Sequence, residues 1–413
     1  MAIDRKRRLL LASLGAGALA AGLYSAARAV PRVWNPCHAS LPPELADHPL
    51  VRAAWDGIDP ARVWDCHAHI AGTGDSGSGI VVAEEMNSLL HPVQFAQRLF
   101  YLNAGCAHDA PGRVDQSYVE RMHNLLEGMR PGVKLMLFAF DRAHDEAGTA
   151  LPERSAFYVP NDYTRDLARK YPQRFEWVAS IHPHRPDAVA ALERAKAEGA
   201  RAVKWLPPAM GIDPASPRCD AFYRTMAKLD LPLISHAGEE KAVHGAGRPE
   251  FGNPLKLRRA LDIGVRVVLA HCASIGEDAD LDRGGKRVAS LELFSRMMAD
   301  ASHRGRLFAD ISAITQRNRP LEVVRTIVEH DDWHGRLLNG SDYPLPGVMP
   351  LFAPAEFARA GMLSDEVVPV LDELHGHNPL LFDFVLKRHL KAGGRSLPVG
   401  IFETRRFFAP ELA

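Results

Sequence analysis

The chain has 413 residues, of which 46% are hydrophobic, and it carries 50 basic and 50 acidic side chains. This content is sufficient for a full buried core, and the balanced charge lacks the basic surface that nucleic-acid binding requires, so no nucleic-acid partner is expected. Length alone is compatible with two or three domains or with one decorated barrel.

The first 29 residues have the pattern of an export signal. Basic residues 5–8 precede an apolar run over 9–27, and small residues at the end of that run predict cleavage before Val30. The Arg7-Arg8 pair resembles a twin-arginine signal, which predicts a periplasmic mature protein. If the signal stays uncleaved, residues 9–27 would anchor the chain to the inner membrane; otherwise no membrane partner is expected.

The five cysteines do not form the even, regularly spaced set of a disulfide framework. A bridge between Cys37 and Cys106 is conceivable, but nothing in the sequence supports it. Cys66 and Cys272 each adjoin a candidate ligand on a predicted strand. We expect both to face the surrounding helices as small buried side chains.

Short β-like runs alternate with helical periodicity at intervals of roughly 20–40 residues, as strands that alternate with helices require. This alternation predicts an α/β fold, a (β/α)8 TIM barrel over residues 61–390. A proline-rich arm (30–60) precedes it, and a tail (391–413) is expected to pack on its exterior. The predicted strands are 63–70, 134–140, 177–181, 202–206, 231–236, 265–271, 307–311 and 336–342.

A long insertion is predicted after the first strand. It opens with the glycine-rich stretch 71–79 and continues with an apolar, helical stretch over 89–102. At that position it would lie over the catalytic face as a lid or substrate wall, or be a surface excursion without a catalytic role. Further helices are predicted over 116–129 and over 379–390, the latter capped by Asn378.

Two histidines separated by one residue are the strongest functional signal. Side chains alternate along a strand, so His67 and His69 should point the same way, and paired imidazoles suit zinc and related metals. Other polar residues follow later strands, namely Lys204, His236, His271 and Asp342. Parallel barrel strands present their C-terminal ends on one face, so these side chains are expected to converge.

In this order and spacing, the motifs resemble the amidohydrolase superfamily, specifically the amidohydrolase-related branch that includes aminocarboxymuconate-semialdehyde decarboxylase. The resemblance covers residues 63–390. It rests on Asp65-Cys66-His67-Ala68-His69, Ala202-Val203-Lys204, residues 231–238, Leu269-Ala270-His271 and residues 339–344.

The residue chemistry and the resemblance imply the same metal centre. His67, His69 and His236 would supply nitrogen ligands and Asp342 an oxygen ligand to a divalent ion. Zinc is the default metal, with manganese, iron or cobalt as alternatives. The resemblance implies that Asp342 also transfers protons. His271 would orient water and polarise the substrate, or ligate a second metal.

Lys204 is ambiguous. It could bind a substrate carboxylate, be held by a neighbouring acid, or be carbamylated and bridge two ions as in two-metal members of the superfamily. Arg317 and Arg319 could grip an anionic group or be plain surface arginines. Glu239 and Glu240 could line the site, although a solvated loop is the simpler interpretation.

The sequence therefore predicts a metal-dependent hydrolase that activates water to cleave a C–N or C–O bond in a small, carboxylated or cyclic substrate. A metal-dependent decarboxylase of an aromatic or unsaturated acid is the alternative. A barrel that only binds a ligand or metal is a third hypothesis, which the proton-handling Asp342 and His271 disfavour. Partners are limited to the small-molecule substrate, and a homo-oligomer is compatible with the sequence.

Overall fold

The computed structural model of the protein describes residues 33–107, 111–243 and 245–412. The predicted signal over 1–29, its cleavage site and the alternative anchor over 9–27 lie outside the described residues. Within the described part of the chain, no helix is both long and apolar enough to cross a membrane.

Eight parallel strands close into a barrel. One sheet has the order β1 (Trp64–His69), β3 (Lys134–Phe138), β5 (Phe175–Val178). The other has the order β12 (Leu337–Leu338), β11 (Leu307–Asp310), β8 (Val267–Leu269), β7 (Leu233–Ser235), β6 (Val203–Trp205). Parallel bridges from Ala179 to Val203 and from Ala68 to Tyr343 join the two sheets into a ring. The predicted (β/α)8 barrel is confirmed, with each strand shorter than expected.

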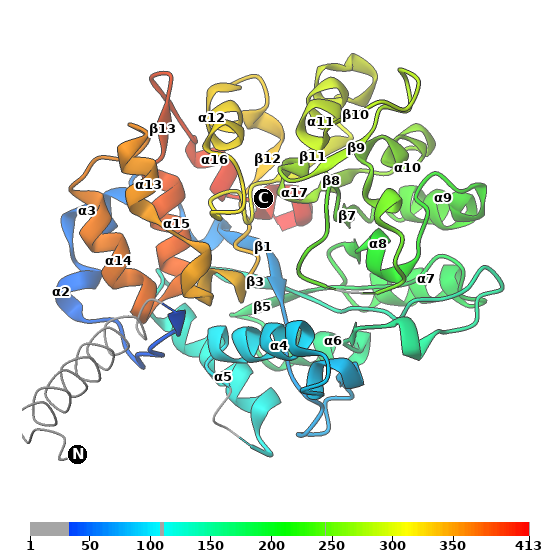
Figure 1. Cartoon of the computed structure of the whole chain (residues 1–413), viewed down its shortest axis with the longest axis horizontal. Coiled ribbons are helices and arrows are strands. Elements are labelled where there is room, and N and C mark those ends of the chain that lie inside the picture. The colour runs from blue at the N-terminus through cyan, green and yellow to red at the C-terminus, as the bar shows by residue number, and fades with distance from the viewer. Residues whose placement is uncertain (1–32, 108–110, 244, 413) are drawn as a thin grey trace, which may run out of the picture.

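A helix follows each strand, and these helices surround the barrel (Figure 1). In chain order they are α5 (Val114–Glu127), α6 (Asn161–Lys170), α7 (Ala188–Ala197), α9 (Asp220–Lys228), α10 (Arg258–Ile263), α11 (Ser290–Ala299), α12 (Leu321–Glu329) and α15 (Pro379–His389). Helix α15 begins where predicted, because the Asn378 side chain accepts a hydrogen bond from the Leu381 amide at 3.0 Å. An additional helix, α14 (Val367–His377), packs beside it.

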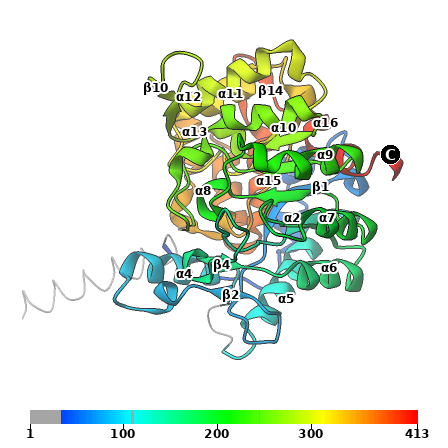
Figure 2. The same cartoon turned by 90° about the vertical axis from the view of Figure 1, so that its right-hand side faces the viewer.

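The core has two parts. The larger cluster lies between the strands and the helices, and a smaller one gathers side chains from around the strand ring. Phe407 and Phe408 of α17 (Arg405–Phe408) belong to the smaller cluster. The expectation that the tail packs on the barrel exterior is therefore wrong for this part of it, because both phenylalanine side chains are buried in the smaller cluster, which removes their apolar surface from water. In Figure 2 the C-terminus lies across the molecule from α4 (Pro92–Ala104).

Strand β1 contains an irregularity that changes the direction of its side chains. Its register with β3 shifts between Asp65 and Ala68, which is the signature of a bulge. Cys66 consequently packs in the smaller, inner cluster, whereas Ala68 belongs to the outer one. The prediction that Cys66 faces the helices is wrong for this reason. Cys272 does lie in the outer cluster as predicted.

The segment between β1 and α5 is ordered around one buried carboxylate. Asp115 accepts hydrogen bonds from the Thr73 amide at 2.7 Å and the Ser78 hydroxyl at 2.6 Å. Gly72 is required there, because a Cβ at this position would lie 2.3 Å from Asp115 Oδ1. The segment continues through β2 (Val81–Val82), which pairs with β4 (Phe157–Tyr158), and through η2 (Glu84–Asn87) to α4, where a helix was predicted.

A disulfide joins Cys37 to Cys106, with the two Cα atoms 5.6 Å apart. It ties the N-terminal arm, with its short helices α2 (Pro43–Ala46) and α3 (Pro49–Ala54), to the chain just after α4. Asn35 reinforces the junction, because its backbone amide donates to the Asn103 side chain at 2.8 Å. The Cys37–Cys106 bridge, which was conceivable from the sequence but without support in it, is thus present.

Candidate metal centre and active site

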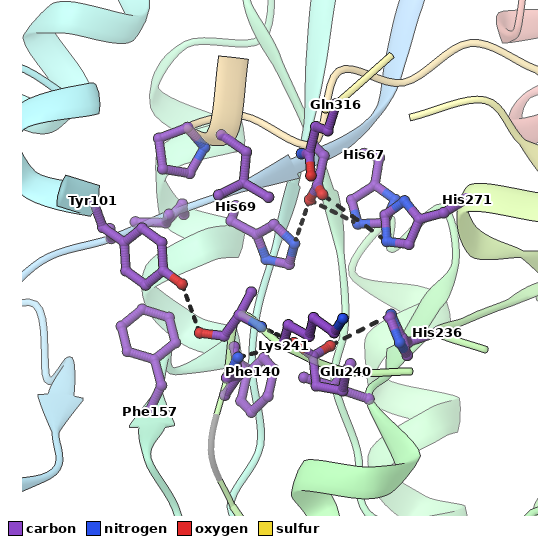
Figure 3. A pocket seen from close by; sticks show the side chains of 18 of the residues that line it. His67, His69, Tyr101, Phe140, Phe157, His236, Glu240, Lys241, His271 and Gln316 are labelled. Atoms are coloured by element: carbon purple, nitrogen blue, oxygen red, sulfur yellow. Dashed lines mark hydrogen bonds and ion pairs between the residues drawn. The ribbon is translucent and has the colours of Figure 1, made fainter. Parts of the chain in front are cut away.

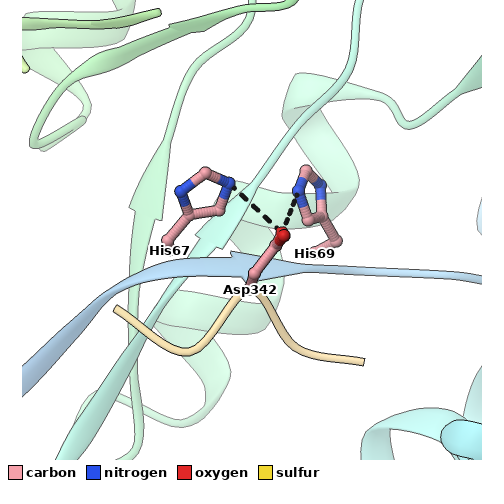
Figure 4. Close-up of side chains that lie close together, drawn as sticks. All are labelled: His67, His69 and Asp342. Atoms are coloured by element: carbon pink, nitrogen blue, oxygen red, sulfur yellow. Dashed lines mark ion pairs between the residues drawn. The ribbon is translucent and has the colours of Figure 1, made fainter. Parts of the chain in front are cut away.

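Three predicted ligands meet at the C-terminal end of the barrel (Figure 4). The Asp342 Oδ1 atom lies 3.4 Å from His67 Nε2 and 3.2 Å from His69 Nε2. One ligand atom from each residue lies within 4.8 Å of the others. His67 and Asp342 are buried, and the side chain of His69 is 27% exposed towards the cavity. Strand β1 and the turn after β12 therefore bring these groups together, as the alternation and topology predict.

The turn that carries Asp342 is pressed against β1. Its backbone is left-handed, with φ of 62°, a conformation that costs about 1–3 kcal/mol in a residue other than glycine and is common at functional sites. The Asp342 amide donates to the His67 carbonyl at 2.8 Å, which holds the two residues side by side. Gly340 permits this approach, because a Cβ there would lie 2.6 Å from His67 Cβ.

Asp310, the last residue of β11, is a site residue that sequence reasoning missed. Its Oδ2 lies 2.9 Å from His67 Nδ1, and its Oδ1 accepts hydrogen bonds from the His271 and Ser312 amides. Burial alone would raise its pKa, but the neighbouring His67 and Lys204 hold the pKa well below the usual range. A carboxylate behind an imidazole leaves the other ring nitrogen, here His67 Nε2, free to bind a metal. The sequence signal that could have identified Asp310 is its position at the end of a predicted strand.

His271 lies beside this cluster with its tautomer defined. Its Nδ1 is 3.1 Å from the Ser312 carbonyl oxygen, so Nδ1 donates and Nε2 is left as an acceptor. That Nε2 lies 3.9 Å from Asp342 Oδ2. Burial lowers the pKa of His271 well below its ordinary value, so the ring is neutral at pH 7.

His236 lines the same cavity, and its ring centroid lies 5.4 Å from that of His271. Its nitrogens are not in the 4.8 Å group formed by the other three predicted ligands. Its buried Nε2 has no hydrogen-bond partner among the described residues, and its Nδ1 lies 3.5 Å from Glu240 Oε2. Glu240, expected on a solvated loop, is only 9% exposed and accepts from the Val243 amide. His236 as a ligand stays a prediction.

Lys204 is buried on the cavity floor. Its Nζ lies 3.1 Å from His67 Nε2 and 4.9 Å from the centre of the Phe138 ring. Burial lowers its pKa, against the raising influence of Asp310 and Asp342. No described carboxylate lies within ion-pair distance of Nζ, which does not favour a lysine held by an acid. The substrate-binding and carbamylated roles stay predictions.

The cluster opens into a cavity of about 150 Å³ whose walls are mainly apolar (Figure 3). Tyr101 of α4 and the loop after β7 meet across it, since the Tyr101 hydroxyl donates to the Ala242 carbonyl at 2.6 Å. The structure separates the two arginines that follow β11. Arg319 lines the cavity, whereas Arg317 pairs with Glu356 outside it.

The residues present fit a divalent ion. Two imidazole nitrogens and one carboxylate oxygen form a donor set common to zinc, manganese, iron and cobalt. Burial lowers the pKa of His67 to about 4, so its ring is neutral and can act as a ligand at pH 7. The unpartnered Nε2 of His236 offers a further nitrogen donor in the same cavity. This donor set does not single out zinc.

The sequence model of a family described as amidohydrolase matches residues 64–369. The chain belongs to the amidohydrolase family. Members of that superfamily bind divalent metals, in agreement with the donor set of His67, His69 and Asp342. A search of curated proteins finds no significant match.

Solved structures similar to this chain include the following three. One is an uncharacterised TIM-barrel protein from Bordetella bronchiseptica, with 18% identity, a TM-score of 0.44, and coverage of 78% of this chain and 99% of that one. Another is 5-carboxyvanillate decarboxylase from Sphingomonas paucimobilis, with 12% identity, a TM-score of 0.46, and coverage of 84% and 99%. The third is a putative 2-pyrone-4,6-dicarboxylic acid hydrolase from Pseudomonas putida, with 16% identity, a TM-score of 0.41, and coverage of 80% and 98%.

Proposed function

We propose that this protein is a metal-dependent hydrolase that cleaves a C–N or C–O bond in a small, carboxylated or cyclic substrate. The observation that supports this most directly is the meeting of His67, His69 and Asp342 at the floor of one apolar cavity. We propose zinc as the metal, with His236 as an additional ligand. The chemistry that a divalent ion supplies at such a site is activation of water and polarisation of a substrate oxygen.

The residues of the chain would then move the proton. Although burial opposes ionisation, the neighbouring imidazoles of His67, His271 and His69 hold the pKa of Asp342 well below its usual range, so the carboxylate is ionised at neutral pH. Asp342 can accept a proton from the attacking water and pass it to the leaving group. His271 presents Nε2 as an acceptor 3.9 Å from Asp342 Oδ2, where it can orient the same water.

The test combines metal analysis with a substrate screen. The purified protein would be assayed with lactones, amides and carboxylated aromatics, with and without a chelator. Loss of a proton-transfer residue costs about 10²- to 10⁴-fold in rate, so Asp342→Asn should lose turnover while keeping its fold. His67→Ala should lose most of the bound metal. Turnover that survives both chelation and Asp342→Asn would contradict the proposal.

Decarboxylation of an aromatic acid is the second candidate. The apolar side chains of Phe140, Phe157 and Ile275 on the cavity wall suit a flat ring, and Arg319 on the same wall suits its carboxylate. Release of carbon dioxide without incorporation of oxygen from labelled water would establish this reaction in place of hydrolysis.

We also propose the periplasm as the place of action. The disulfide between Cys37 and Cys106 supports this, because disulfides persist in oxidising compartments. Mass spectrometry of the protein from cell fractions is the test. A mature chain beginning at Val30 in the periplasmic fraction is expected, and an unprocessed chain in the cytoplasm would contradict the proposal.

A further inference from the structure

Arg319 is a buried cation whose hydrogen bonds leave part of its guanidinium group unused. Its Nε donates to Ser274 Oγ at 2.9 Å, and its Nη1 donates to Gln316 Oε1 at 2.7 Å and to Asn318 Oδ1 at 2.6 Å. All three acceptors are neutral. No described residue pairs with Nη2, although the side chain lines the cavity and only 8% of the residue is exposed. Two N–H donors in a fixed orientation are therefore left for a ligand.

Burial of this charge needs a counter-charge. An isolated buried cation is costly, and buried arginines are normally paired with carboxylates. Burial lowers the pKa of Arg319, but only to about 10, so the group stays charged at neutral pH. Asp342 and Glu240 influence this pKa through their charge, yet neither lies within ion-pair distance of the guanidinium. The position is thus prepared for an anion that arrives from outside.

The other charges of the cavity favour the same conclusion. Its described lining includes three cationic side chains, Arg98, Lys204 and Arg319, and two buried carboxylates, Glu240 and Asp342. Lys241 and Glu239, at the exposed edge of the cavity, form an ion pair with an N–O distance of 3.1 Å, so their charges cancel. A divalent ion at the His67–His69–Asp342 cluster would add to the positive excess. An anionic ligand would reduce it.

We propose that Arg319 binds a carboxylate of the substrate through Nη2 and so determines the preference of the site for acids with a small apolar body. As a statement about the substrate, this inference rests on the proposed function. Binding of a carboxylate to Arg319 can nevertheless be measured without turnover. A cavity of about 150 Å³ accommodates a benzene-sized body. The two N–H donors of Nη2 are held in the guanidinium plane by the three hydrogen bonds of the group, whereas the ammonium of a lysine is a flexible point charge. Through Ser274, Arg319 is also attached to the loop that carries His271.

The experiment compares benzoate with the neutral analogue benzamide by calorimetric titration of the full-length protein with its metal in place. Loss of a charged hydrogen-bonded pair should weaken benzoate binding about 10- to 100-fold in Arg319→Gln, with little change for benzamide. Arg317→Gln is the matched control. Arg317 is 53% exposed and pairs with Glu356 outside the cavity, so this variant should bind benzoate like the wild type.

Arg319→Lys is a second variant, which keeps the charge but removes the fixed donors of Nη2, and it should weaken benzoate binding several-fold. Wild-type affinity for benzoate in either variant, with unchanged metal content and melting temperature, would overturn the inference. So would a wild-type protein that binds benzoate no better than benzamide. If Arg319 binds benzoate but no substrate is turned over, the proposed function fails and this inference stands.

Discussion

Replacement of Asp310 by asparagine should weaken metal binding while the shape of the site is preserved. The side-chain oxygen of the new amide is held in place, because the amides of His271 and Ser312 donate to Oδ1 at 3.0 and 3.1 Å and require an acceptor. The side-chain NH2 group of the asparagine must then occupy the position of Oδ2, 2.9 Å from His67 Nδ1. Two donors cannot face each other there. The His67 proton should move to Nε2, the nitrogen that faces the cavity and would bind the metal.

The size of the effect follows from this change of tautomer. Loss of a carboxylate that orients a metal-binding histidine typically costs 10- to 100-fold in metal affinity, or about 1.4–2.8 kcal/mol. The backbone hydrogen bonds to Oδ1 are retained in Asp310→Asn, so the loss should be confined to His67. We therefore expect a folded protein with weakened metal binding.

Competition with a chromophoric chelator at pH 7.5 measures the affinity for zinc directly. Asp300→Asn is a suitable control, since that aspartate is 48% exposed and caps a surface turn through the Ser302 amide. The control should bind zinc like the wild type. Equal zinc affinity in Asp310→Asn and the wild type, with matching circular dichroism spectra, would refute the assignment of His67 Nε2 as a ligand atom oriented by Asp310.

Three further predictions concern other parts of the fold. Gly340→Ala places a Cβ 2.6 Å from His67 Cβ and should lower both metal content and melting temperature; normal values of both would contradict the close packing. Burial lowers the pKa of His375 to about 4, below the ordinary 6.5, so the unfolded state takes up a proton first as the pH falls. Between pH 7 and 5 the wild type should lose about 2 kcal/mol of stability that His375→Gln does not lose, measured by urea unfolding at both pH values; equal losses would refute this. Cys37 and Cys106 close a loop with a sequence separation of 69, so reduction should destabilise the wild type by about 4 kcal/mol. A Cys37→Ser/Cys106→Ser variant should not respond to reductant, and a wild type that melts at the same temperature in reductant would show that the bridge contributes nothing.

Part of the candidate site could be predicted because its placement depends on short-range rules. Alternation along a strand places His67 and His69 on one side, and the common direction of barrel strands brings Asp342 to the same end. Asp310 obeys the same rule as a strand-end acid. Its role was not evident, because it depends on contact with a histidine 243 residues away.

The bulge in β1 shows where local rules fail. Strict alternation would turn Cys66 away from the barrel interior, yet the shifted pairing with β3 directs it inward. The bulge is a property of two paired strands, and the sequence of one strand does not reveal it.

By itself the sequence determined the succession of strands and helices, since periodicity and capping act between residues a few positions apart. Only the tertiary structure decided that Cys37 pairs with Cys106, that Phe407 enters the inner cluster, and that Arg319 rather than Arg317 lines the cavity. These outcomes depend on packing between segments that are distant along the chain, and the burial of apolar surface and of charge selects among arrangements that local preference leaves equal.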